Sequence, residues 1–182
     1  DQNIYTDFNE AISENGYKLF LKKLYEYGFT VIQNCKTEMS SVEKIAKKIG
    51  YVRESIFGGL WSFESNEDKA DSAYTQEELR PHTDSTYSND APGLQLLLCC
   101  HYKASGGESI MVDGFKIAEK IKNEKREIYD LLTQIEVTGQ YIGDGVFLKA
   151  KRPIFRVNSD NELIQVSFNN YDRAPFKFSE DK

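Results

Sequence analysis

Histidine is scarce in this 182-residue chain, which contains two, and cysteine is nearly as scarce, with three. A site that needs several imidazoles therefore cannot be completed within the sequence. An odd number of cysteines, two of them adjacent at Cys99 and Cys100, makes a poor disulfide framework and favours a reducing compartment. These two lie in an apolar run, where we expect them to be buried structural thiols.

The chain also lacks an apolar run near the roughly 20 residues of a membrane span, and it lacks an excess of positive charge. Its 23 Lys and Arg residues face 29 Asp and Glu residues, a formal net charge of −6. Nucleic acids and anionic membranes require clustered positive charge, so we expect neither as a partner. The chain opens at Asp1 without a signal-peptide pattern. We therefore predict a trimmed chain from a cytoplasmic protein, or a mitochondrial one if the source is eukaryotic.

What is present is an ordinary globular composition, with 40% hydrophobic and 13% aromatic residues. Segments with helical periodicity lie near the N-terminus and in one later insertion. Gly28 is expected to end the first helix, Ser40 or Ser41 to cap the N-terminus of the second, and Asp113 to cap that of the third. Short strands in between indicate an α+β domain around an antiparallel sheet or barrel. The expected helices span 16–27, 42–49, 114–122 and 124–132, and the expected strands 29–33, 93–101, 109–112, 135–137, 153–157 and 163–168, with a turn at Asp160-Asn161.

The sharpest local signal is the pattern His82-Thr83-Asp84. In a strand, residues i and i+2 project from the same face, so an imidazole and a carboxylate can converge on one ion. Two histidines and one carboxylate leave three positions open on iron(II), enough for a bidentate cosubstrate and dioxygen. The pattern alone is more typical of a surface histidine beside an aspartate. The neighbouring sequence must therefore decide whether these two residues bind a metal ion.

Several blocks accompany this pattern in a fixed order. They are WSFESNEDKADSAYTQEELRPHTDSTY over 61–87, PGLQ over 92–95, GGESIMVDGF over 106–115 and FNNYDRA over 168–174. Together they resemble the trimethyllysine dioxygenases and the related gamma-butyrobetaine dioxygenases, within the taurine-dioxygenase-like iron enzymes, over essentially residues 15–176. The resemblance implies a mainly β core, a double-stranded β-helix or jelly roll, with helices outside. It also implies hydroxylation that uses iron(II), 2-oxoglutarate and dioxygen and releases succinate and carbon dioxide.

The resemblance also implies which parts of the family's catalytic domain this sequence contains and which it lacks. The family's second metal-binding histidine, in an H-G-R block near the C-terminus, and a later arginine for 2-oxoglutarate have no counterpart in this sequence. We therefore expect the closing C-terminal strands to be missing. His101, the only other imidazole, matches no family ligand. The expected parts are one incomplete catalytic domain over 1–182, with a lead-in over 1–52, a substrate-cage loop region over 53–81 and a jelly-roll core over 82–182 that carries a helical insertion at 114–133.

By the same resemblance, His82 and Asp84 are the metal-binding and catalytic residues, with iron(II) as the metal and ascorbate as a candidate reductant. Ser109 stands where more distant relatives use a threonine hydroxyl to bind 2-oxoglutarate. A serine that opens a strand needs no function, so that assignment remains open.

Three aromatic residues fall at the family's cage positions for a quaternary ammonium: Phe57, Trp61 and Tyr74. Such a cation cannot donate hydrogen bonds, and ring faces attract it by about 0.5–2 kcal/mol each. Phe57 stands where relatives usually have tyrosine. The alternative is that these are ordinary core aromatics, because Phe57 and Trp61 are four residues apart and could form a helical stripe.

Asp71 and Asn169 fall at positions that contact the far end of the substrate. Trimethyllysine presents an α-ammonium and an α-carboxylate there, whereas gamma-butyrobetaine presents only a carboxylate. An acidic side chain attracts the ammonium and repels a lone carboxylate, and the trimethyllysine enzymes carry Asp where Asp71 lies. Asn169 can donate to a carboxylate. A solvated loop charge is the competing interpretation of Asp71.

The sequence therefore predicts hydroxylation of N6-trimethyllysine at the carbon β to its α-carbon, the first step of carnitine biosynthesis. Gamma-butyrobetaine hydroxylation is the nearest alternative. An alternative of another class is a non-catalytic module that binds trimethylammonium, because the second histidine is absent. The expected partner is a small quaternary-ammonium substrate, and a homodimer that completes the site from another chain is a further option.

Overall fold

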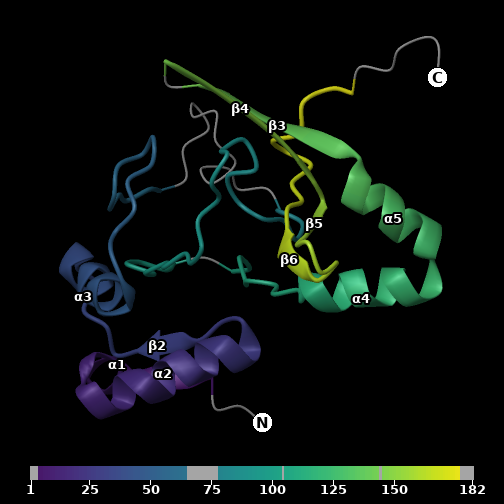
Figure 1. Cartoon of the computed structure of the whole chain (residues 1–182). Helices are drawn as coiled ribbons and strands as arrows, with labels where there is room; N and C mark the ends of the chain where they lie inside the picture. The colour runs from purple at the N-terminus through teal and green to yellow at the C-terminus, as the bar shows by residue number, and fades with distance from the viewer. Residues whose placement is uncertain (1–3, 65–77, 104, 144, 177–182) are drawn as a thin grey trace. The chain divides into compact units, whose positions relative to one another are not determined.

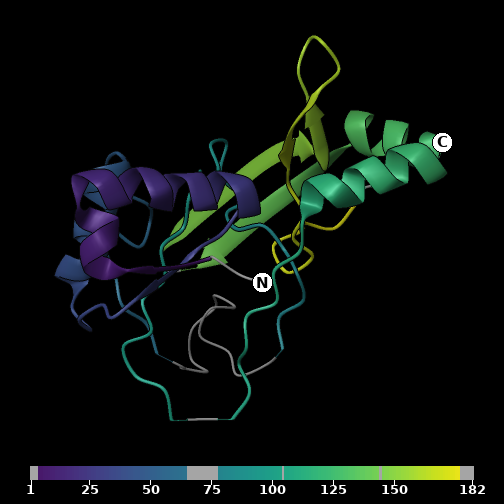
Figure 2. The same cartoon turned by 90° about the horizontal axis from the view of Figure 1, so that it is seen from below.

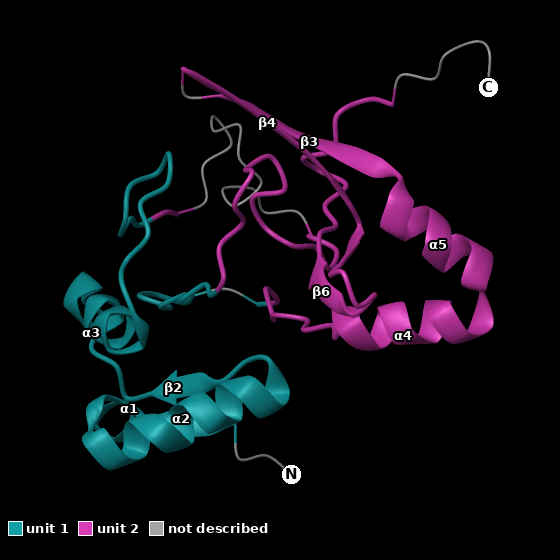
Figure 3. Ribbon diagram, in the orientation of Figure 1, with its two compact units in different colours: residues 1–62, 94–105 teal, residues 63–93, 106–182 magenta. Residues whose placement is uncertain are grey.

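The computed structural model describes residues 4–64, 78–103, 105–143 and 145–176. It divides into two compact units, residues 1–62 with 94–105 and residues 63–93 with 106–182 (Figure 3). We describe each unit by itself. The predicted substrate residues Asp71 and Tyr74 lie outside the described residues.

The first unit packs three helices against a short parallel strand pair (Figure 1). Its core consists of Ala11, Phe20 and Ile45, all at most 3% exposed. Its elements are β1 (Tyr5–Asp7), α1 (Phe8–Ile12), α2 (Glu14–Tyr27), β2 (Val31–Gln33) and α3 (Met39–Ile49). The predicted helix over 16–27 and the predicted strand over 29–33 are thus confirmed in kind, with boundaries shifted by two residues.

The ends of α2 follow capping rules that are visible in the sequence. The Ser13 hydroxyl accepts a hydrogen bond from the Gly16 N–H at 3.0 Å, which satisfies a donor that the helix itself cannot pair. Gly28 ends the helix with φ of 73° and donates its N–H to the Leu24 carbonyl at 2.9 Å. Only glycine adopts this left-handed conformation without a Cβ penalty, so the predicted stop at Gly28 is confirmed.

The start of α3 differs from the prediction. Glu38, rather than Ser40 or Ser41, is the N-cap, and it makes no side-chain capping bond. Both serines lie inside the first turn, where the Ser40 hydroxyl donates to the Glu38 carboxylate at 3.2 Å and Ser41 is buried. Ser40 thus contacts the capping residue from within the first turn, a position that the sequence pattern does not distinguish from the N-cap itself. The predicted end at Gly50 is confirmed.

The second unit contains two helices and two antiparallel hairpins. Figure 2 shows α4 and α5 beside the β5–β6 hairpin, and the buried core of this region is Ala118, Tyr129 and Phe155. The elements are α4 (Gly114–Glu124), α5 (Arg126–Gln134), β3 (Glu136–Gly143), β4 (Val146–Pro153), β5 (Phe155–Val157) and β6 (Leu163–Val166). Asp113 caps α4 by accepting from the Lys116 N–H at 2.9 Å, as predicted.

The turn between β5 and β6 forms where Asp160-Asn161 predicts it. The Asn158 side-chain oxygen accepts from the N–H groups of Asp160 and Glu162, at 3.0 and 2.9 Å. Asn161 adopts a positive φ of 62°, a conformation that asparagine tolerates better than most residues. The composition of this segment therefore specifies its turn.

Two predicted strands are wrong. Residues 93–101 and 109–112 form no strand in the described part of the chain, and Leu97 and Ile110 are 70% and 68% exposed. Cys99 and Cys100 are exposed rather than buried. An apolar run predicts burial only if another strand supplies the backbone hydrogen bonds that hold it, and neither run is paired within the described residues.

The longest strand pair was largely missed by the sequence pattern. The strand predicted over 135–137 continues to Gly143 as β3, and β4 pairs with it in register from Glu136↔Pro153 to Gly143↔Val146. β4 contains Lys149, Lys151 and Arg152, so its alternation is weakly hydrophobic. The described residues contain three two-stranded sheets with five helices, which confirms a mixed α and β class.

None of the helices in the described ranges combines the length and the apolar character needed to cross a bilayer.

Candidate functional site

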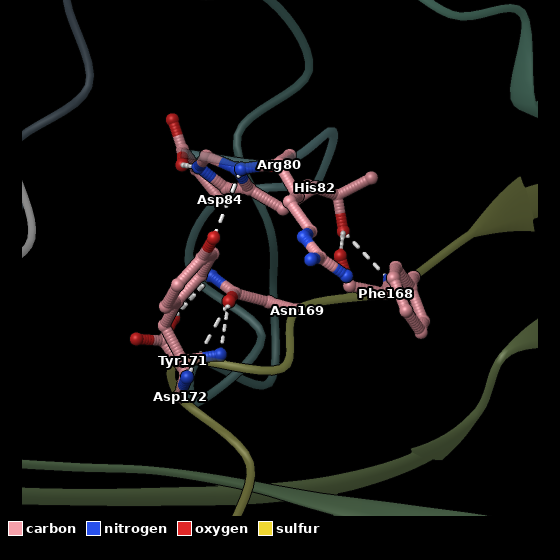
Figure 4. A network of polar contacts seen from close by, with 8 residues as sticks. Arg80, His82, Asp84, Phe168, Asn169, Tyr171 and Asp172 are labelled. Carbon is pink, nitrogen blue, oxygen red and sulfur yellow. Dashed lines mark hydrogen bonds and ion pairs between the residues drawn. The ribbon is translucent and has the colours of Figure 1, made fainter. Parts of the chain in front are cut away.

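The candidate site is centred on His82 and Asp84, whose side chains converge as predicted. The His82 Nε2 atom lies 3.2 Å from the Asp84 Oδ1 atom, with side-chain exposures of 21% and 41% (Figure 4). The segment that carries them is an irregular extended loop rather than a strand. Backbone pairing with a second segment, rather than a regular ladder, positions the two side chains.

The tautomer of His82 follows from its other ring nitrogen. Nδ1 lies 2.7 Å from the Arg80 carbonyl oxygen, which can only accept, so Nδ1 carries the proton. The Nε2 atom of the ring faces the Asp84 carboxylate. A nitrogen and a carboxylate oxygen this close form an ion pair when a proton lies between them, and the same pair of ligand atoms suits a divalent metal ion.

Thr83, between these two residues, fixes the loop to the segment after β6. Its N–H donates to the Phe168 carbonyl at 2.7 Å, and its hydroxyl accepts from the Phe168 N–H at 2.9 Å. Both main-chain groups of Phe168 are therefore used by one residue. Because alternate residues of an extended segment point to opposite sides, binding Thr83 leaves His82 and Asp84 on the other side.

A tight turn at Asn169 supports His82 through Tyr171. The buried Asn169 accepts from the Tyr171 N–H at 2.8 Å through Oδ1, and its Nδ2 donates to the Asp172 carboxylate at 2.9 Å. Tyr171 returns to the loop, where its hydroxyl accepts from the Arg80 N–H at 2.9 Å. Its ring meets the His82 ring edge-on, with centroids 5.8 Å apart. The turn thus holds the residue whose carbonyl sets the His82 tautomer.

The hairpin β3–β4 in turn holds the Asn169 turn. The Gln140 N–H donates to the Asp172 carbonyl at 2.7 Å, the Ala174 N–H donates to the Thr138 carbonyl at 2.9 Å, and Gly139 forms a bridge with Arg173. The site is therefore attached to the most extensive strand pair of the unit.

Phe57 and Trp61, the described cage residues, lie together in the first unit. Their ring centroids are 5.0 Å apart and their planes differ by 33°. Phe57 lies in a turn, where the Ser55 hydroxyl accepts from the Phe57 N–H at 3.1 Å, and Trp61 follows in irregular structure. Neither residue is helical, so the alternative of a helical stripe is wrong. Half-buried rings of this kind can present a face to a cation.

Of the remaining predicted residues, one joins the network around His82 and the others lie apart from it. Asn169 belongs to the His82 network. Ser109 is exposed, and it does not open a strand. His101 is also exposed, in the first unit. Sequence reasoning missed the supporting roles of Thr83, Arg80 and Tyr171. The last of these could have been found from its place inside the same FNNYDRA block as Asn169.

The described residues contain no group of three or more His, Cys, Asp or Glu side chains placed to hold a metal ion. His82 and Asp84 form a pair, and they fit two of the three protein positions of a facial triad, with one nitrogen and one oxygen ligand. The hydrogen bond from Nδ1 to a backbone carbonyl is the outer contact that metal-binding histidines usually make.

Comparison with known proteins identifies the class to which this fold and this residue pair belong. The family model of the taurine catabolism dioxygenase TauD, TfdA family matches residues 4–180. The chain therefore belongs to this family of dioxygenases.

Within this family, the chain is similar to two kinds of dioxygenase. The chain is 36% identical over 165 residues to the trimethyllysine dioxygenase of Meyerozyma guilliermondii and 33% identical over 167 residues to the mitochondrial trimethyllysine dioxygenase of Homo sapiens. It is 34% identical over 158 residues to the gamma-butyrobetaine dioxygenase of Pseudomonas sp.. These matches cover 89%, 89% and 87% of the chain but 41%, 40% and 41% of the relatives. The chain thus spans about two fifths of their length.

Proposed function

We propose that this chain carries the iron-binding and substrate-binding part of an iron(II)- and 2-oxoglutarate-dependent enzyme that hydroxylates N6-trimethyllysine. The observation that carries the proposal is the convergence of His82 and Asp84, whose Nε2 and Oδ1 atoms lie 3.2 Å apart while Nδ1 is bound to the Arg80 carbonyl. It is supported by family membership and by the likeness to trimethyllysine dioxygenases. We propose the jelly roll of this family as the architecture.

The residues present fit the metal, and iron(II) together with 2-oxoglutarate would supply the oxidising power that places oxygen on an unactivated carbon. The chain's contribution is positional. His82 Nε2 and an Asp84 oxygen would hold the ion, while the Arg80 carbonyl keeps the imidazole in the tautomer that leaves Nε2 free to bind it. Ser109 remains the proposed contact for 2-oxoglutarate, and ascorbate the proposed reductant.

Substrate recognition would use both ends of trimethyllysine. The rings of Phe57 and Trp61, with that of Tyr74, would surround the trimethylammonium group. Asp71 would pair with the α-ammonium. Asn169 uses one amide hydrogen on Asp172, and a second hydrogen on the same nitrogen remains to donate to the substrate carboxylate. Anchors at both ends would fix the carbon that reacts.

Gamma-butyrobetaine is the second candidate substrate, because relatives named for it match the chain at 34% and 27% identity. The two substrates differ in the α-ammonium group, which only trimethyllysine carries. The identity of residue 71 therefore separates the two proposals.

The test offers each substrate to the chain with iron(II), 2-oxoglutarate and ascorbate in air and quantifies hydroxylated product by mass spectrometry. We expect trimethyllysine to be preferred about 10-fold or more, since a hydrogen bond to a charged group contributes about 1.5–3 kcal/mol. The matched variant Asp71→Asn should lose most of that preference. Faster turnover of gamma-butyrobetaine by the unchanged chain would contradict the trimethyllysine assignment. Saturable trimethyllysine binding without any product would show that this chain binds the substrate but does not complete the catalytic site by itself.

A further inference from the structure

The adjacent thiols of Cys99 and Cys100 take no part in the proposed function. All three cysteines of the chain are free, and these two are exposed, whereas Cys35 is half-buried. The pair lies in the first unit, in an irregular segment of the chain. Thiols that reach solvent are open to soft ligands and electrophiles, whereas buried structural thiols are inert. Cys99 and Cys100 are therefore a candidate ligand site apart from His82 and Asp84.

The exposure of both neighbours follows from the place where the burial pattern of this segment ends. Leu96 and Leu98 are half-buried and Leu97 is exposed, which is the alternation of an extended chain. Leu96 packs against the core of the first unit. Cys99 continues the pattern as an exposed residue, but Cys100, which has the phase of a half-buried one, is exposed as well. Both thiols thus lie at the surface, directly after residues that the core holds.

A direct disulfide between these two thiols is disfavoured by the geometry of the backbone. The peptide bond between them is trans, and consecutive Cα atoms across a trans peptide bond are about 3.8 Å apart. Disulfides usually join Cα atoms about 4.4–6.8 Å apart, and departures from this range store strain that makes the bond easier to reduce. The pair is therefore better suited to the dithiol form than to a disulfide.

An atom placed between the two sulfurs removes this constraint. A soft centre bonded to both sulfurs keeps them farther apart than an S–S bond does, so the two side chains need not converge as closely. Such centres prefer thiolate sulfur to nitrogen or oxygen ligands. Once one thiol has bound, the peptide bond that joins the residues keeps the second thiol close at hand. Binding through both sulfurs is thus favoured over binding through either one alone.

The number of ligands beside the pair determines which kind of centre fits. The described residues contain no group of three or more His, Cys, Asp or Glu side chains placed to hold a metal ion. His101 follows directly, but the Cys99 thiol contacts its backbone carbonyl oxygen, at 3.9 Å, rather than its ring. In the described part of the chain the site therefore offers two sulfur ligands. A tetrahedral zinc site needs more ligands than this, whereas a centre with two open positions is satisfied.

We propose that Cys99 and Cys100 together bind a soft, thiophilic metal or metalloid centre that has two positions open for sulfur. A trivalent organoarsenical such as phenylarsine oxide is the simplest example, because a phenyl carbon occupies its third valence. In the reaction both S–H bonds break and two As–S bonds form. The oxygen on arsenic leaves as water with the two thiol protons, and arsenic stays trivalent. The inference does not rest on the proposed function, because neither iron nor the His82–Asp84 pair takes part.

The test titrates the reduced, metal-free chain with phenylarsine oxide and follows the adduct by mass spectrometry of the intact protein. We expect one phenylarsenic group per chain and the loss of two free thiols. Cys99→Ser and Cys100→Ser should each weaken binding about 100-fold or more, because linking two binding groups raises affinity by about 10²–10⁴ and a single thiol lacks this gain. Cys35→Ser is the matched control, and it should change the affinity less than about 2-fold.

A competition experiment on the unchanged chain separates chelation from ordinary modification of single thiols. Dithiothreitol, a dithiol, should remove the phenylarsenic group, whereas mercaptoethanol at the same concentration of thiol groups should leave it in place. The proposal is overturned if either Cys99→Ser or Cys100→Ser binds as tightly as the unchanged chain, or if Cys35→Ser weakens binding as much as they do. Removal of the adduct by mercaptoethanol as readily as by dithiothreitol would overturn it as well.

Discussion

The variant His82→Ala is expected to lose at least about 100-fold in affinity for a divalent metal ion. Removing a residue that merely orients a metal ligand typically costs 10–100-fold, so removing the ligand itself should cost at least the upper value. Cobalt(II) is a suitable probe, because it accepts the same nitrogen and oxygen ligands as iron(II). Anaerobic calorimetric titration of the chain measures the change.

The other histidine of the chain serves as the control. His101→Ala removes an imidazole that is exposed and lies outside the site, and we expect cobalt affinity to change less than about 2-fold. Asp84→Asn should behave like His82→Ala, because it keeps the shape of the side chain and removes the charge that binds the ion. Equal losses in His82→Ala and His101→Ala would mean that the metal is bound by scattered surface histidines.

The second large effect is expected at Gly139, in the middle of β3. Alanine there would bring its Cβ to 2.5 Å from both the carbonyl carbon and the carbonyl oxygen of Thr86. These are backbone atoms, so relief requires β3 or the loop after Asp84 to shift. Forced overpacking of this kind lowers the free energy of unfolding by about 1–3 kcal/mol. Urea denaturation followed by circular dichroism measures it.

Gly93→Ala is the matched control in the same unit, because no atom lies within 4 Å of the added Cβ. We expect a change within about 0.5 kcal/mol. If Gly139→Ala were equally harmless, the close approach of Thr86 to β3 would be wrong.

The helices could be predicted well because their signals are local. Gly28 ends α2 and Asp113 begins α4 through contacts with residues three or four positions away, so the necessary information lies within a short window. Ser40 and Ser41 show the limit of such signals. Both are good capping residues, yet the helix begins at Met39, one residue before the first of them.

The strands could not be predicted equally well because a strand exists only with a partner. The apolar run 93–101 has the composition of a buried strand but forms none, whereas β4, with alternating lysines, forms one through its register with β3. Composition favours burial, but backbone pairing over long sequence distances decides which runs become strands.

The candidate site shows the same contrast between local signals, which the sequence reveals, and long-range contacts, which it does not. The spacing of His82 and Asp84 is local, and it predicted that the two side chains converge. The residues that hold them come from about 85 positions later, as with Thr83 and Phe168, and no local pattern links the two segments.

The most direct test of the central claim is the nitrogen NMR spectrum of the histidine-labelled chain, which should contain only two imidazoles. For His82, the hydrogen bond to the Arg80 carbonyl predicts a protonated Nδ1, which leaves Nε2 as the nitrogen that binds a metal ion. Adding one equivalent of manganese(II) should broaden the His82 signals beyond detection and leave those of His101 sharp. Equal broadening of both rings, or His82 signals that stay as sharp as those of His101, would contradict the metal site.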